Sequence, residues 1–159
     1  GGEVVWDATD PATAHLTVTT PATRAVWGRI AGRRFELGGW TLSLGELERN
    51  YAVVVITSMD GRPLESSERM LLVAVSSAEN EEMRWNESRT SVGRHWGRGP
   101  TLVTGVSADV ILRGPPVKIR ALDGRGEPAG DVPVETLPNG SRFTIGPPCR
   151  TLWYEVRRP

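Results

Sequence analysis

The chain has 159 residues, of which 38% are hydrophobic, so we expect a single domain with a core of ordinary size. Nineteen basic residues balance nineteen acidic ones, and this zero net charge provides no long-range field to attract nucleic acid or an anionic membrane surface. The longest apolar runs, 51–56 and 70–75, have about a third of the roughly 20 residues that a membrane-spanning helix needs. We therefore expect neither nucleic acid nor a membrane as a partner.

Tryptophan and cysteine usage narrows the possibilities further. Tryptophan supplies six of the ten aromatic residues, and its large ring is enriched where a protein meets a ligand or a partner. Cys149 is the single cysteine, which excludes an internal disulfide and a metal cluster built from several thiolates. The chain begins with Gly-Gly rather than Met, and its first residues lack the pattern of a signal peptide. We expect residues 1–159 to be one domain of a longer chain.

Alternation between apolar and polar residues predicts β-strands along the whole chain, with turn signals about every ten residues. Residues 15–19 place Leu16 and Val18 on one face of a strand and leave His15 on the polar, solvated face. Residues 40–44 repeat this pattern. The runs 51–56 and 70–75 are apolar on both faces, which is typical of central strands.

Three dipeptides predict tight turns, because Asp and Asn tolerate the left-handed backbone region and the Gly after them enters it freely. Asp60-Gly61 lies between the two apolar runs, Asp123-Gly124 closes a strand over 117–122, and Asn139-Gly140 joins 132–137 to 142–145. No stretch of a dozen residues has a helical apolar stripe. We predict an all-β fold: an antiparallel β-sandwich, jelly-roll-like, of about ten short strands with one long loop.

The long loop runs from Ser77 to Pro100, and its 24 residues are mostly polar. Structureless loops longer than about 12 to 15 residues are uncommon and are usually functional or disordered. Trp85 and Trp96 lie within this loop and argue against disorder. The loop is therefore the best candidate for a functional site.

The residues give little support for catalysis. A Ser-His-acid triad needs a histidine beside a serine and a carboxylate, but only His15 and His95 are available and no Gly-x-Ser-x-Gly elbow occurs. Glycoside hydrolysis needs two carboxyl groups about 5 to 9.5 Å apart, and the loop offers four glutamates, which in a polar loop are usually solvated. We name no catalytic residue and no cofactor. A structural calcium ion held by carboxylates and backbone carbonyls is an alternative that the sequence leaves open. The four glutamates are Glu79, Glu81, Glu82 and Glu87.

Ligand binding on aromatic platforms fits the loop better. Sugar rings expose C–H faces that pack on indole, while polar side chains bind the hydroxyl groups. Trp85-Asn86-Glu87 and Arg94-His95-Trp96 each place a tryptophan beside such groups. In the alternative interpretation, both indoles fold back and cover the core. The candidate ligand-binding residues are Trp85, Asn86, Glu87, Arg94, His95 and Trp96.

The other four tryptophans are assigned by the phase of their strands. Trp40 shares a face with Leu42, and Trp6 shares one with Val4, so we expect both to lie in the core. Trp27 and Trp153 alternate out of phase with their apolar neighbours, which predicts exposed positions. Trp27 and Trp153 therefore form a secondary candidate surface, either a flat platform for a ligand or a contact with a neighbouring domain.

Several segments of the chain resemble a β-rich region that follows the catalytic barrel in some secreted bacterial glycoside hydrolases. The resemblance extends over most of the chain from about residue 16. It implies an accessory, non-catalytic β-sandwich similar to a carbohydrate-binding module, exported with its enzyme to the periplasm or the medium. The segments that carry it are 20–24, 57–64, 71–80, Trp85-Asn86-Glu87, Trp96-Gly97, 99–101, and more weakly 143–145 with 151–154.

Three functions follow from these observations. The first is binding of a neutral polysaccharide or oligosaccharide by an accessory domain of a polysaccharide-degrading enzyme, with the loop as the binding surface. The second is structural: a sandwich that packs on and stabilises the catalytic barrel of the same chain. The third is a small glycoside hydrolase that uses the loop carboxylates.

Overall fold

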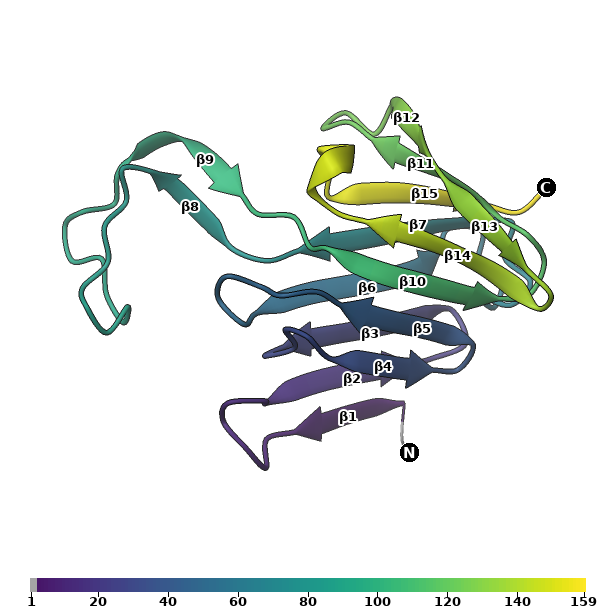
Figure 1. Cartoon of the computed structure of the whole chain (residues 1–159), viewed down its shortest axis with the longest axis horizontal. Helices are drawn as coiled ribbons and strands as arrows, with labels where there is room; N and C mark the ends of the chain where they lie inside the picture. The colour runs from purple at the N-terminus through teal and green to yellow at the C-terminus, as the bar shows by residue number, and fades with distance from the viewer. Residues whose placement is uncertain (1–2) are drawn as a thin grey trace.

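The computed structural model describes residues 3–159, and the alternating segments form the predicted all-β architecture. Two antiparallel sheets pack face to face as a β-sandwich, and a two-stranded arm projects from one end (Figure 1). Fifteen strands are present in the described part of the chain rather than about ten. Strand β12 (Pro128–Val132), for example, has the sequence Pro-Ala-Gly-Asp-Val, which has no apolar alternation to predict a strand.

The larger sheet has eight strands, and each neighbouring pair is antiparallel. In spatial order they are β1 (Val4–Asp7), β2 (His15–Thr19), β3 (Thr23–Gly28), β6 (Ala52–Ser58), β7 (Arg69–Val75), β15 (Trp153–Arg157), β11 (Lys118–Leu122) and β12 (Pro128–Val132).

The smaller sheet has five strands and covers one face of the larger sheet (Figure 1). Its order is β13 (Val134–Leu137), β14 (Gly140–Ile145), β10 (Ala108–Arg113), β5 (Trp40–Leu44) and β4 (Arg34–Leu37). The arm consists of β8 (Ala78–Glu81) and β9 (Arg98–Val103), and a single 3-10 turn, Pro147–Cys149, precedes β15. No helix among residues 3–159 is long and apolar enough to cross a membrane.

The core lies between the two sheets and is built from the inward-facing positions of both. Trp40 is 1% exposed, as its phase in the 40–44 pattern predicts, and Leu42 beside it is fully buried. The larger sheet contributes Val54, Ile56 and Leu72. Burying such side chains is the main favourable term in folding.

The predicted turns connect the predicted strands. Strands β6 and β7 are neighbours, with Val53 opposite Val75 and Ile56 opposite Leu72. Asp123-Gly124 lies between β11 and β12, and Asn139-Gly140 connects β13 to β14.

Asp60 stabilises the connection between β6 and β7 through its carboxylate. It accepts hydrogen bonds from the hydroxyl groups of Ser58 and Ser67 at 2.8 and 2.9 Å, and from the backbone N–H of Glu68 at 2.7 Å. Desolvation opposes ionisation of this carboxyl, but the hydrogen bonds outweigh it and hold the pKa of Asp60 well below its usual range. The residue therefore has a structural role in this turn.

Two predictions about side-chain orientation are wrong. Trp6 is 63% exposed instead of buried, because β1 is the edge strand of the larger sheet and Trp6 points away from the smaller sheet. In β2 it is the face carrying His15 that turns inward: His15 is buried, 5.2 Å from the ring of Phe35, and its Nδ1 lies 2.9 Å from the carbonyl of Thr13. Leu16 and Val18 consequently lie on the outward face.

The core position of Trp40 leads to a stability prediction. Trp40→Ala should lower the free energy of unfolding by about 3 to 5 kcal/mol, because the core cannot fully collapse into the space of a buried indole. The Trp40 indole N–H has no hydrogen-bond partner among the described residues, so this loss is one of packing alone. Urea unfolding followed by circular dichroism measures it, and Trp96→Ala, at a 62% exposed position on the arm, is the control. Equal effects of the two substitutions would contradict the assignment of Trp40 to the core.

Candidate functional site

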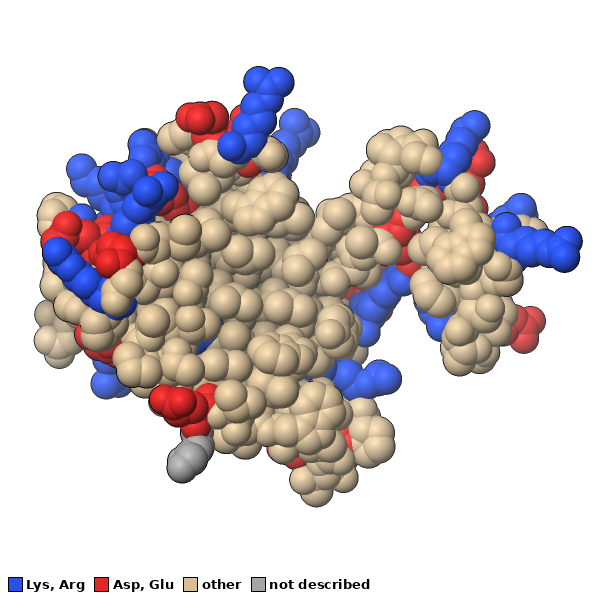
Figure 2. Space-filling view, turned by 180° about the vertical axis from the view of Figure 1, so that it is seen from behind, with Lys and Arg blue, Asp and Glu red and all other residues tan. Residues whose placement is uncertain are grey.

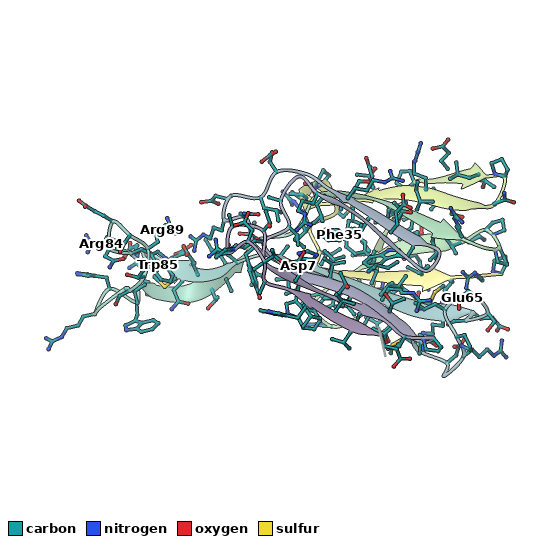
Figure 3. The ribbon with its side chains drawn as sticks, turned by 90° about the horizontal axis from the view of Figure 1, so that it is seen from below. Asp7, Phe35, Glu65, Arg84, Trp85 and Arg89 are labelled. Carbon is teal, nitrogen blue, oxygen red and sulfur yellow. The ribbon has the colours of Figure 1, made fainter. Side chains whose placement is uncertain are left out.

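The segment predicted as a long loop forms the arm. Strands β8 and β9 pair with Ala78 opposite Val103 and Asn80 opposite Thr101. At the base, the backbone N–H of Ser76 donates to the carbonyl of Thr104 at 2.9 Å. Figure 3 shows the arm leaving the end of the sandwich at which Asp7 lies, with Trp85 at the arm's far end. The part of the chain with the strongest functional signal is therefore held away from the core.

The tip of the arm, residues 82–97, is folded on itself by local hydrogen bonds. The backbone N–H of Arg84 donates to the carbonyl of His95 at 3.0 Å, and that of Asn86 donates to the carbonyl of Ser91 at 2.9 Å. The Asn86 side chain accepts a bond from the backbone N–H of Thr90 at 2.8 Å. These bonds give the tip a defined shape although it lies outside the sandwich.

Trp85 is fixed by a group of charged residues around Glu79. Its indole N–H donates to a carboxylate oxygen of Glu79 at 2.7 Å, and the same oxygen forms ion pairs with Arg49 and, at 3.5 Å, with Arg89. The guanidinium groups of Arg49 and Arg89 lie 5.9 and 5.7 Å from the centre of the indole ring, within the range of cation–π attraction. Arg49 belongs to the loop between β5 and β6, so this cluster also connects the arm to the sandwich.

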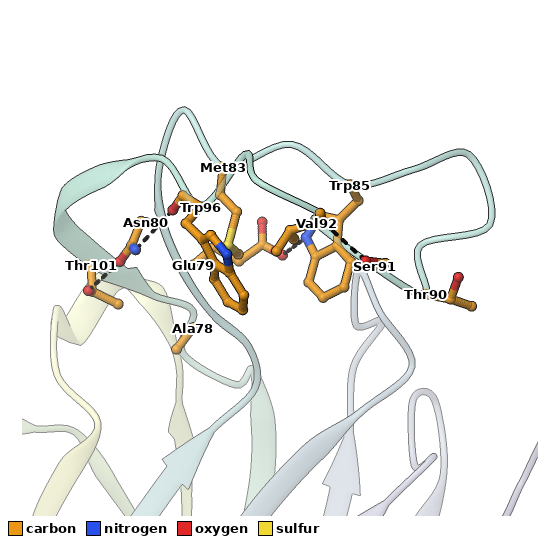
Figure 4. Close-up of a pocket in the computed structure, with 11 residues that line it drawn as sticks. Ala78, Glu79, Asn80, Met83, Trp85, Thr90, Ser91, Val92, Trp96 and Thr101 are labelled. Carbon is orange, nitrogen blue, oxygen red and sulfur yellow. Dashed lines mark hydrogen bonds between the residues drawn. The ribbon is translucent and has the colours of Figure 1, made fainter.

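An open pocket of about 500 Å³ lies on the arm between the two tryptophans (Figure 4). Trp85 is half-buried and forms one wall, whereas Trp96 is 62% exposed. Val92 is buried at the tip, so an apolar side chain also lies beneath the pocket. The lining residues are Ala78, Glu79, Asn80, Met83, Trp85, Thr90, Ser91, Val92, Gly93, Trp96 and Thr101.

The structure brings together some of the predicted site residues. Trp85 and Trp96, eleven positions apart in the sequence, line one pocket. Asn86 and His95 instead line an adjoining hollow of about 430 Å³, which shares Trp85 with the first pocket. Glu87 and Arg94 are exposed and line neither space. The other candidate surface, Trp27 and Trp153, lies on the larger sheet and not on the arm.

Other pocket residues were not identified from the sequence. Asn80 donates to the carbonyl of Trp96 at 3.0 Å and accepts from the hydroxyl of Thr101 at 2.7 Å, which fixes the Trp96 backbone. The pairing of β8 with β9 produces this arrangement, and neither strand has an alternating pattern to reveal it. Arg49 is 30 positions before Glu79, so no local motif indicates their contact.

Two ionisable groups with shifted pKa values, Glu155 and Tyr154, lie on β15 and not in the pocket. Desolvation opposes ionisation of Glu155, but hydrogen bonds from Arg157 and Arg120 outweigh it and lower the pKa of its carboxyl. Burial raises the pKa of Tyr154 to about 12. Within residues 3–159 no group of three or more His, Cys, Asp and Glu side chains is placed to hold a metal ion.

Comparison with known proteins gives no relative: no protein-family model matches the chain, and no match is found among curated proteins or solved structures.

The folding of the arm depends on Gly97, which leads to the second prediction. Gly97 has φ +69°, and a Cβ atom there would overlap the backbone of Glu81 and Met83. Gly97→Ala should therefore disrupt the pairing at the end of the arm, whereas the sandwich should keep its unfolding midpoint. Hydrogen exchange measures this as faster exchange of the amides of residues 80–97.

Gly93 provides the matched control, because it has φ +53° but no atom within 4 Å of an added Cβ. Gly93→Ala should cost only the conformational strain of a left-handed alanine, about 1 kcal/mol, and leave exchange on β8 unchanged. Similar exchange in both variants would show that the close approach at Gly97 does not hold the arm together.

Proposed function

We propose that this domain is a non-catalytic carbohydrate-binding accessory domain that binds a neutral glycan in the pocket between Trp85 and Trp96. The observation that carries the proposal is the convergence of these two indoles on one open pocket of about 500 Å³. Pockets of about 300 to 1,000 Å³ are typical for small ligands. An open pocket with two aromatic walls suits a short stretch of a sugar chain.

The chemistry of the lining supports a neutral ligand. Glu79 is the only charged residue in the lining, and its carboxylate is already paired with Arg49 and Arg89 and hydrogen-bonded to Trp85. The hydroxyl groups of Thr90 and Ser91 border the same space. The pocket thus offers an exposed indole for stacking and small polar groups for sugar hydroxyls, without an uncompensated charge that would select an ion.

The same lining argues against hydrolysis as the function. Both retaining and inverting glycosidases use two carboxyl groups across the scissile bond, and the pocket contains one. The one carboxylate in the pocket, that of Glu79, is already held in ion pairs with Arg49 and Arg89. We therefore place no catalytic residue in this domain.

The biological setting of the proposal comes from the sequence resemblance. An accessory domain of a secreted bacterial polysaccharide-degrading enzyme would hold its catalytic domain near the substrate. The alternative, a sandwich that packs on and stabilises a catalytic barrel, does not need the arm pocket and would use an apolar sheet surface instead.

Calorimetric titration with cello-, xylo-, manno- and laminari-hexaose tests the proposal. We expect a Kd between about 1 μM and 1 mM for at least one glycan, because an open site buries few ligand atoms. Trp96→Ala should weaken binding at least about tenfold by removing the exposed stacking surface. Binding should change little between low and high salt, because stacking on an indole is mainly dispersive and apolar.

Trp153→Ala is the matched control, since Trp153 is 38% exposed but lies on the larger sheet. It should retain full affinity. Trp85→Ala also removes the hydrogen bond to Glu79, so its effect includes loosening of the arm. A folded Trp96→Ala variant with unchanged affinity for a confirmed glycan would contradict the proposed site.

A further inference from the structure

The larger sheet carries a row of basic side chains at the end of the sandwich opposite the arm. Lys118 on β11 lies directly opposite Arg157 on β15, and Arg157 lies directly opposite Arg69 on β7. All three are exposed and point away from the smaller sheet, since the residues next to them in the sequence face the core. Figure 2 looks onto this side of the sheet and shows basic side chains gathered at the end away from the arm. We call Lys118, Arg157 and Arg69 the cationic row.

Acidic residues beside the cationic row balance only part of its charge. Arg157 and Arg69 bind the same carboxylate oxygen of Glu155, at 2.8 and 3.4 Å. Arg120 binds the other oxygen of this carboxylate. Asp131 lies opposite Arg120 on β12 and offsets its charge. Four basic residues therefore share two acidic ones, and positive charge is in excess at this place.

Stability alone does not account for the cationic row. Like charges directly opposite each other on one face of a sheet destabilise the pairing of their strands. Within residues 3–159 Lys118 forms no ion pair, so its ammonium group adds to this repulsion without compensation. A local surplus of cations on a chain with zero net charge points to an anionic ligand.

The buried carboxylate of Glu155 holds the arginine side chains in place for such a ligand. Each guanidinium group carries five N–H donors in a rigid fork. Arg157 and Arg69 each bind Glu155 through one nitrogen, so donors remain on both forks for a second anion. Because Glu155 already restrains the long side chains, an incoming anion meets donors that are ordered in advance.

We propose that the cationic row binds the carboxylate groups of an acidic glycan. An arginine fork matches a planar carboxylate and can donate two parallel hydrogen bonds to it. The row crosses three strands that lie about 4.8 Å apart, so it extends over about 10 Å and can bind more than one carboxylate of a chain that lies across the strands. The site lies on the sandwich, away from the arm, and is separate from the proposed pocket for a neutral glycan.

Acidic peptides and nucleic acids fit the cationic row less well than a glycan. An extended peptide binds a sheet by adding a strand to a free edge, but β7, β15 and β11 each lie between two paired strands. Single-stranded nucleic acid needs aromatic platforms for its bases, and on β15 the indole of Trp153 lies at the other end of the strand from Arg157. A glycan can bind through its carboxylates while its hydroxyl groups stay hydrated on this open surface.

Calorimetric titration of the full chain with hexagalacturonate tests the proposal. The row recognises carboxylates, so one polyuronate is a sufficient probe. We expect a Kd between about 10 μM and 1 mM at about 20 mM salt, and at least about tenfold weaker binding at about 500 mM salt, where exposed charges are screened. The fully methyl-esterified hexasaccharide, which has no charge, should bind at least about tenfold more weakly than the acid. Trp96→Ala should bind hexagalacturonate like the native chain.

Two substitutions in the row have closely matched controls. Arg157→Gln and Arg69→Gln should each weaken binding at least about fivefold by removing a charged donor. Arg142, on the smaller sheet, matches Arg157 with 51% against 50% side-chain exposure. Arg34, also on the smaller sheet, matches Arg69, and both are 58% exposed. Arg142→Gln and Arg34→Gln should retain the native affinity.

Lys118→Gln separates binding from folding, because it leaves the ion pairs of Glu155 in place. It should weaken binding at least about threefold through the loss of one cation. At low salt its urea unfolding midpoint should equal or exceed that of the native chain, since the repulsion with Arg157 is relieved. A lower midpoint together with unchanged affinity would show that the row serves only the fold, and would overturn the proposal.

Three further results would overturn the proposal. The first is a native chain that does not bind hexagalacturonate at about 20 mM salt. The second is equal affinity of folded Arg157→Gln and Arg142→Gln variants. The third is tighter binding of a hexaglutamate peptide or of a thymidine hexanucleotide, which would assign the row to another class of anion. None of these results bears on the arm pocket, which is tested with neutral glycans and Trp96→Ala.

Discussion

The shape of the candidate site depends on one carboxylate, Glu79. A two-stranded hairpin outside a sandwich has no core of its own and is marginally stable in water. Glu79 compensates by binding three side chains: Trp85 and Arg89 at the tip, and Arg49 in the sandwich. Because both Glu79 and Arg49 are largely shielded from water, at 23% and 22% side-chain exposure, this pairing is screened less than a surface ion pair.

Much of the sandwich was predictable because strand phase and turn chemistry are local properties. The 40–44 alternation correctly buried Trp40, and the Asp and Asn turns correctly connected their strands. Sheet order is not local, and this explains the error at Trp6: its strand alternates like a core strand but lies at the edge, beyond the smaller sheet. At the site, composition identified the right segment, but only the pairing of β8 with β9 brings Trp85 and Trp96 to one pocket and directs Asn86 elsewhere.

The central claim is that Trp85 and Trp96 form the ligand site, and the indole N–H signals of the six tryptophans in a nitrogen–proton correlation spectrum test it most directly. On titration with a bound hexasaccharide, the signals of Trp85 and Trp96 should shift together in proportion to occupancy. Those of the buried Trp40 and of Trp6, Trp27 and Trp153 on the larger sheet should stay in place. Shifts confined to Trp6, Trp27 and Trp153, with Trp85 and Trp96 unchanged, would contradict the account.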